Sequence, residues 1–303
     1  MVVIEIALQM LAEVITVLIA LAGNLFIVYV YFLEFRKTKA LQPNELLVTV
    51  LALFNILVQF SLVLWFMLYL FNLCTYFGGV IYKVTDFNII FFSKSSYWFT
   101  AWLCFFYCMK IIKVKRMFFI RLKQRMSLLV KILILCTMML NFSLAYPVVF
   151  LIKLKANSTS ISILCKDYYI TGDTTHIYGA SLSFLTSLSP LAVMLVSSMG
   201  IVIFLCLHSR NMKRNAIAGN SSHGNTHTAV AVMIICLILL YMLCTITVLS
   251  ANLQVALAQF DTLVAITFTS SLYSAGSSLI LITGTVKLRQ SCVTLFCSCR
   301  QQQ

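Results

Sequence analysis

Long apolar runs separated by short polar segments dominate the chain. Seven of these runs are long enough to cross about 30 Å of hydrocarbon as α-helices. They are continuous and lack an alternating polar face, which favours helices over the strands of a membrane barrel. The third run is the least clean, because Lys94 and the serines around it interrupt its start. The expected helices cover approximately residues 7–33, 46–71, 89–112, 127–152, 180–207, 229–253 and 262–286, and residues 287–303 form a tail.

The composition strengthens the membrane interpretation. Of the 303 residues, 61% are hydrophobic and 10% are charged, and the mean hydropathy is +1.00. A soluble domain of this length could not cover so much apolar surface, because its own exterior must face water. The sequence therefore predicts an all-α membrane protein that forms a single seven-transmembrane helix bundle.

The distribution of positive charge predicts the orientation. The net charge is +14, and most of the 22 lysines and arginines follow the first, third and fifth expected helices or lie in the tail. Basic loops of this kind stay on the cytoplasmic side of a membrane. The N-terminus is therefore expected outside and the C-terminus in the cytosol. Because the membrane explains the basic excess, no nucleic-acid partner is expected.

Two modification signals fit this orientation. Asn157-Ser158-Thr159 is a glycosylation sequon in the longest loop expected outside. Toward the same side, Cys74 and Cys165 either form one disulfide or remain unpaired. Three cysteines follow the seventh helix beside basic residues, where they are either palmitoylated or free thiols. These candidate palmitoylation sites are Cys292, Cys297 and Cys299.

The motifs of an enzyme are missing from the sequence. No His-Glu-x-x-His spacing, phosphate-binding glycine loop or Gly-x-Ser-x-Gly elbow occurs, so neither catalysis nor a cofactor is expected. The helices also lack the repeats and midplane charges typical of transporters. Glu13 is the one acidic residue inside an apolar run, and a solvated position at the membrane rim is favoured over a ligand contact. The low charge within the helices argues against a strongly charged ligand.

Polar and aromatic residues within the helices indicate packing and binding positions. Asn24 and Asn55 each lie in the middle of an apolar run, and a buried amide must find a partner, so both are expected to fix helix packing. Trp98 and Trp102 are four residues apart, which stacks them on one helix face. Aromatic residues toward the outer end form either an interfacial belt or the wall of a pocket for drug-sized apolar molecules.

The loop after the third helix combines basic and apolar side chains. Residues 113–125 contain six lysines and arginines around an apolar segment that includes Met117 and Phe118. Such a mixture suits an anchor at the lipid headgroups or a docking face for a partner protein, and one role does not exclude the other.

Short patterns follow one another in order along residues 20–290, whereas the rhodopsin-like Asp-Arg-Tyr and Asn-Pro-x-x-Tyr motifs do not occur. The patterns are Gly23–Ile27, Pro43–Leu47, Trp98 with Phe106-Tyr107 and Lys110-Ile111, Phe119–Arg125, Pro190 with His208 and Met212, His227 with Tyr241, and Ser278–Gln290. Each pattern is short, but the ordered set is specific. Together they resemble the bitter taste receptors, the type 2 taste receptor family.

This resemblance implies a G-protein-coupled chemoreceptor for small bitter organic compounds in the plasma membrane. Its implied partners are a gustducin-like heterotrimeric G protein and membrane lipid. The candidate ligand-binding residues are Trp98, Trp102, Phe184 and Tyr241. The candidate G-protein contacts are Lys113, Arg116, Lys123, His208, Met212 and Lys213. The alternatives are a vomeronasal type 1 pheromone receptor and, from a different class, a small-solute transporter or channel.

The chain departs from the family pattern at several helix positions. Asn55 stands where the family usually has Arg, Ser277 where it has His, and Trp102 where a pocket Asn is common. Val232 and Phe204 replace a usual Lys and a usual Ser. These changes indicate a divergent member with an altered ligand range or altered basal activity.

Overall fold

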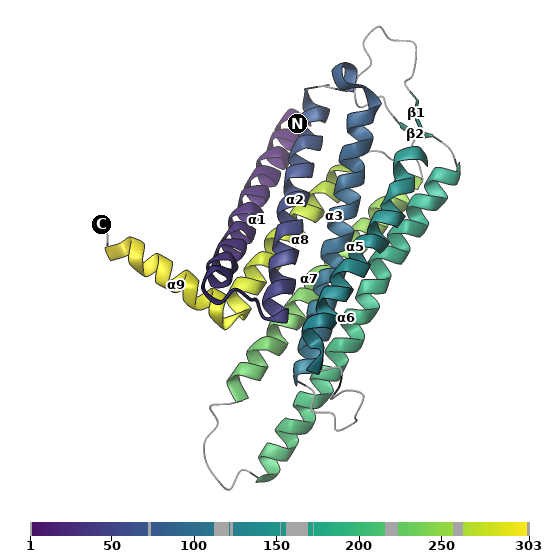
Figure 1. Cartoon of the computed structure of the whole chain (residues 1–303). Helices are drawn as coiled ribbons and strands as arrows, with labels where there is room; N and C mark the ends of the chain where they lie inside the picture. The colour runs from purple at the N-terminus through teal and green to yellow at the C-terminus, as the bar shows by residue number, and fades with distance from the viewer. Residues whose placement is uncertain are drawn as a thin grey trace.

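Helices account for nearly all of the described chain (Figure 1). The computed structural model describes residues 2–71, 74–111, 121, 124–151, 153–155, 169–171, 173–215, 224–256 and 263–301. In these ranges the bundle consists of α1 (Val2–Thr38), α2 (Pro43–Leu70), α3 (Cys74–Ile111), α5 (Met126–Leu151), α6 (Asp173–Asn215), α7 (Gly224–Ala256) and α8 (Leu263–Gly284). The short strands β1 (Lys153–Lys155) and β2 (Tyr169–Thr171) pair antiparallel, and α9 (Val286–Gln301) follows α8.

The order of helix contacts places α3 inside the bundle. It packs against α2, α5, α6 and α7, while α1 lies between α2 and α8 and α7 lies between α6 and α8. The β1–β2 pair lies at the end where α1 begins, and α9 runs sideways from the opposite end (Figure 1). These two ends are called the hairpin end and the α9 end below.

The outward surface of the bundle is apolar, and much of its interior is polar. Large hydrophobic side chains face outward on every bundle helix, with 72% of Val196 and 66% of Leu243 exposed. In contrast, Asn24, Asn55 and Gln59 are at most 1% exposed. An exterior of this kind is suited to lipid, which does not penalise exposed apolar groups as water does.

Six helices in the described ranges are long and apolar enough to cross a membrane, whereas α3 is not among them. Lys94 and the neighbouring serines lower the hydropathy of α3, although it occupies the central position in the bundle. A seventh span at α3 therefore stays a prediction. The bundle is all-helical as expected, and the two short strands are confined to one connection.

The expected helix boundaries miss polar helical extensions. α3 begins at Cys74 rather than at residue 89, and α6 begins at Asp173 rather than at residue 180. With 43 residues, α6 is about 65 Å long, twice the hydrocarbon thickness, so its ends do not need apolar residues. The expected tail is also helical, because α9 spans Val286–Gln301.

Candidate ligand-binding and coupling sites

Three tyrosines from different helices meet near the middle of the bundle. Tyr97 of α3 packs edge-to-face against Tyr241 of α7 and Tyr273 of α8, with ring centroids 5.0 and 4.8 Å apart. The rings of Tyr241 and Tyr273 are 6.1 Å apart, and all three side chains are buried. Edge-to-face pairs contribute beyond the burial of their area. This tyrosine cluster (Tyr97, Tyr241 and Tyr273) therefore joins α3, α7 and α8.

Hydrogen bonds extend the tyrosine cluster to α6. The hydroxyl of Tyr241 donates to the backbone oxygen of Ser187 at 2.6 Å, and Lys94 Nζ donates to Ser187 Oγ at 2.9 Å. The hydroxyls of Tyr273 and Thr100 lie 2.6 Å apart. Four helices thus share one polar and aromatic centre, so that a group inserted there would move all four against one another.

The two tryptophans of α3 stack as their spacing predicts. The rings of Trp98 and Trp102 have centroids 5.3 Å apart and an interplanar angle of 27°. Trp102 Nε1 donates to Thr137 Oγ1 of α5 at 2.9 Å, and its ring meets Phe105 edge-on. Both tryptophans are half-buried. The pair therefore lies on the α5 side of α3.

The four candidate ligand-binding residues do not form one group. Tyr241 is fully buried in the tyrosine cluster, whereas 58% of Phe184 is exposed on the surface of α6. Trp98 and Trp102 lie on the face of α3 that meets α5. The structure thus brings Trp98 and Trp102 together and places Tyr241 elsewhere, where Ser187 connects it to Lys94. Lys94 and Ser187 are not among the residues that the sequence predicts for the site.

Most candidate coupling and modification residues carry no described side chain. Lys113, Arg116, Lys123 and Asn157 lie outside the described residues, as does Cys165. The backbone of α6 places His208, Met212 and Lys213 in its last turns, at the α9 end, and that of α9 includes Cys297 and Cys299. Cys292 is a free, half-buried thiol on α9.

A network of amides and hydroxyls confirms the predicted packing role of Asn24 and Asn55. Asn24 Nδ2 donates to the backbone oxygen and the Oγ of Ser274 on α8, at 3.3 and 3.2 Å. Asn55 Nδ2 of α2 donates to Asn24 Oδ1 and to Ser277 Oγ, both at 3.3 Å. α1, α2 and α8 are therefore linked by buried hydrogen bonds.

The expected position of Glu13 at a solvated rim is wrong. Its Oε1 accepts a hydrogen bond from Ser271 Oγ of α8 at 2.7 Å. Its Oε2 is buried and has no hydrogen-bond partner in the described part of the chain. The carboxyl group therefore lies in the α1–α8 interface, where Ser271 is the described hydrogen-bond partner of one of its two oxygens.

An ion-pair cluster ties α9 to the bundle at the α9 end. Lys287 Nζ lies 2.8 Å from Glu45 Oε1 and 3.1 Å from Glu34 Oε1. Glu45 also accepts a hydrogen bond from the backbone N of Gln42 at 3.0 Å, as acidic residues do in the first turn of a helix. Burial lowers the pKa of Lys287, but the hydrogen bonds that it donates to the two glutamates, together with their negative charge, raise it more, so the net pKa is above its ordinary value.

Lys287→Ala is expected to destabilise the bundle by about 1–2 kcal/mol, because it leaves the buried Glu45 carboxylate without its cation. The measurement is the apparent melting temperature of the purified protein in detergent, which should fall by a few degrees. Arg289→Ala removes an exposed cation from the same helix and should leave the temperature unchanged. Equal shifts for the two variants would contradict this assignment.

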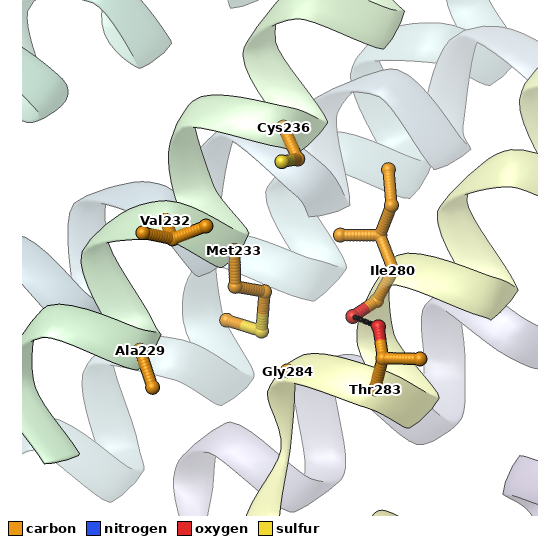
Figure 2. Close-up of a pocket in the computed structure, with 7 residues that line it drawn as sticks. All are labelled: Ala229, Val232, Met233, Cys236, Ile280, Thr283 and Gly284. Carbon is orange, nitrogen blue, oxygen red and sulfur yellow. Dashed lines mark hydrogen bonds between the residues drawn. The ribbon is translucent and has the colours of Figure 1, made fainter. Parts of the chain in front are cut away.

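A cavity of about 470 Å³ lies between α7 and α8 (Figure 2). Its lining is apolar apart from Thr283, and Val232 of α7 is among the lining residues. A side chain at Gly284 would meet Met233 Cγ at 2.4 Å, so the glycine lets Met233 lie against α8. The lining residues are Ala229, Val232, Met233, Cys236, Ile280, Thr283 and Gly284.

Sequence reasoning overlooked the residues that become important only through contacts between helices. Along the sequence, Lys94 interrupts an apolar run, and no local pattern singles out Tyr273 in the last helix. A lysine within a membrane-length segment is itself the signal that could have identified this position. No signal along the chain pairs Lys287 with Glu34 and Glu45, which lie in two other helices.

The apolar exterior and the membrane-length helices define a helical membrane bundle. The model of the family "Taste receptor protein (TAS2R)" matches residues 1–300, so the chain belongs to the bitter taste receptor family of G-protein-coupled receptors. It is a receptor and not an enzyme. This membership decides against the pheromone-receptor and transporter alternatives.

Individual relatives are distant but match over long stretches. Taste receptor type 2 member 1 of Pan paniscus is 28% identical over 289 residues, which cover 93% of each chain. Taste receptor type 2 member 40 of Gallus gallus is 28% identical over 202 residues, covering 65% of each chain. Taste receptor type 2 member 39 of Mus musculus is 27% identical over 228 residues, covering 73% of this chain and 70% of the relative.

Proposed function

We propose that this receptor crosses the plasma membrane seven times, with its N-terminus outside, and activates a gustducin-like G protein when a small bitter compound binds within the bundle. The observation that carries the proposal is the polar and aromatic centre shared by α3, α6, α7 and α8. A central site built from several helices suits a small molecule with a few polar groups. The excess of basic residues in the loops expected inside supports the orientation.

The mechanism we propose is a shift between two populations of the bundle. A ligand that separates Tyr241 from Ser187 favours an arrangement in which α6 and α7 stand apart at the α9 end. His208, Met212 and Lys213 would then meet the G protein there, and Lys113, Arg116 and Lys123, from the basic segment that follows α3 in the sequence, would join them in binding it. The ligand shifts the equilibrium only because it binds the arrangement with α6 and α7 apart more tightly than the arrangement in which Tyr241 contacts Ser187.

The test expresses the chain with a promiscuous taste-type G protein and records calcium over a panel of bitter compounds. Dose-dependent responses that vanish without the G protein are expected. Trp98→Ala and Tyr241→Phe should then weaken the responses, and Phe184→Ala, whose side chain is 58% exposed, should weaken them least. Silence of a receptor that reaches the cell surface would contradict the proposal.

Two modifications belong to the same proposal. Asn157 is a glycosylation site if the second outside loop faces the secretory lumen, and Asn157→Gln would then increase gel mobility. Cys292, Cys297 and Cys299 lie on α9 beside basic residues, where palmitate would hold the helix at the membrane. Loss of a hydroxylamine-sensitive label in their serine variants checks this second modification.

A further inference from the structure

A lysine is buried in the bundle, and none of the carboxylates that the structure describes is paired with it. Lys94 is 8% exposed, and its Nζ donates to Ser187 Oγ and lies 5.4 Å from the centre of the Tyr97 ring. Among the residues whose side chains the structure describes, both ion pairs belong to Lys287. The acidic residue that precedes Lys94 on α3 is Asp86, which lies about 12 Å away along the helix axis.

An ammonium group in this position requires more compensation than its two described contacts provide. It carries three N–H donors, and one hydroxyl acceptor and one ring face account for two directions. Taking a charge out of water is costly unless an opposite charge and further hydrogen bonds replace the lost hydration. Ionisable residues inside membrane bundles are accordingly associated with ligands or with one another.

The surroundings of Lys94 connect it to the proposed site of ligand action. Ser187, which accepts its hydrogen bond, also accepts the hydroxyl of Tyr241 through its backbone oxygen. Tyr97, whose ring faces the ammonium group, contacts both other members of the tyrosine cluster. A group that draws Lys94 away from Ser187 would therefore disturb the contacts of α3, α6 and α7 together.

We infer that Lys94 recognises an acidic group, and that the agonists of this receptor include small organic carboxylic acids whose carboxylate pairs with the Lys94 ammonium. This inference rests on the proposed function, because it assigns a ligand class to the same bundle. It reverses the expectation of a weakly charged ligand, which came from the low number of charges in the helices. The one buried charge of Lys94 decides the ligand class more strongly than the low overall number of charges in the helices, because no described carboxylate neutralises it.

The experiment compares carboxylic acids with their own methyl esters on the same receptor. Calcium responses to 1-naphthoic acid, 4-phenylbutyric acid and salicylic acid are recorded beside those to the three esters and to a panel of neutral bitter compounds. On the unmodified receptor, each active acid should be on the order of tenfold more potent than its ester. A receptor that responds to the esters or the neutral panel but to no acid overturns the inference.

Variants separate a ligand contact from a structural role. Lys94→Met keeps the length of the side chain without its charge, and it should remove the advantage of the acids while responses to neutral agonists persist. Lys94→Arg should retain the advantage. Lys83→Met, which removes a half-buried lysine from the same helix, is the matched control and should change nothing. Equal losses for acids and neutral agonists in Lys94→Met would assign the lysine to the fold alone and overturn the inference.

Two further arms keep the result clear. If Lys94→Met does not reach the cell surface, the acid-to-ester ratio of the unmodified receptor and of Lys94→Arg decides the question. Replacing chloride in the buffer with methanesulfonate, which is not a carboxylate, should leave all responses unchanged, and a loss of the neutral responses would assign the site to an inorganic anion instead. Silence toward every compound, acidic and neutral, would count against the proposed function itself.

Discussion

Replacing Asn24 with leucine is expected to destabilise the bundle by about 2–4 kcal/mol. Leucine has the same branching and the same number of side-chain heavy atoms as asparagine and is not smaller, so the loss comes from hydrogen bonds and not from a cavity. The change removes the two contacts of Asn24 with Ser274 and deprives Asn55 Nδ2 of one acceptor. The orphaned groups lie in the interior of the bundle, where no lipid can satisfy them.

The measurement is fluorescence-detected size-exclusion chromatography of the tagged receptor in mild detergent. Asn24→Leu should lose most of its monodisperse peak and melt at a lower temperature than the unmodified protein. Ser143→Leu is the control, because Ser143 is exposed on α5 and bonds only within its own helix. A normal peak for Asn24→Leu would show that the network contributes little to stability.

The packing role of Asn24 and Asn55 and the stacking of the two tryptophans are features that the sequence alone could predict. Asn24 and Asn55 are conspicuous because each is a lone amide in an apolar run, so a packing role followed from the cost of burying an amide. The stacking of Trp98 and Trp102 followed from helical geometry alone. Both predictions concern a single helix or a general need for partners, and neither depends on how the helices are arranged.

The features that the sequence did not predict depend on the length of the helices and on which helices pack against one another. Hydropathy predicts a short third helix, because it does not detect the polar helical residues with which α3 begins at Cys74. The sequence predicts Glu13 at a solvated rim, because its contact with Ser271 of α8 depends on how α1 and α8 pack. The environment of Lys94 is made by α6, some 90 residues further along the chain, and no local pattern in α3 indicates it.

Gly23→Ala is expected to cost about 1–3 kcal/mol, because α1 and α8 approach closely at this glycine. An added Cβ would lie 2.4 Å from Ser278 Oγ and 3.0 Å from Ser278 Cβ. The hydroxyl can rotate away only by giving up its bond to the backbone oxygen of Ala275, and the Cβ of Ser278 cannot move without its helix. The apparent melting temperature in detergent should therefore fall.

A second substitution tests this explanation directly. Ser278→Gly removes both atoms that the new methyl group meets, so the double variant should lose less stability than the two single variants together. Gly276→Ala is the matched control on α8, because its Cβ would meet Leu240 Cδ2 at 2.8 Å, the far end of a flexible side chain that can turn aside. Strict additivity of Gly23→Ala and Ser278→Gly would refute the steric explanation. The close approach at Gly23 brings Asn24, its neighbour on α1, within reach of Ser274, so the small side chain and the hydrogen-bond network stabilise the same interface.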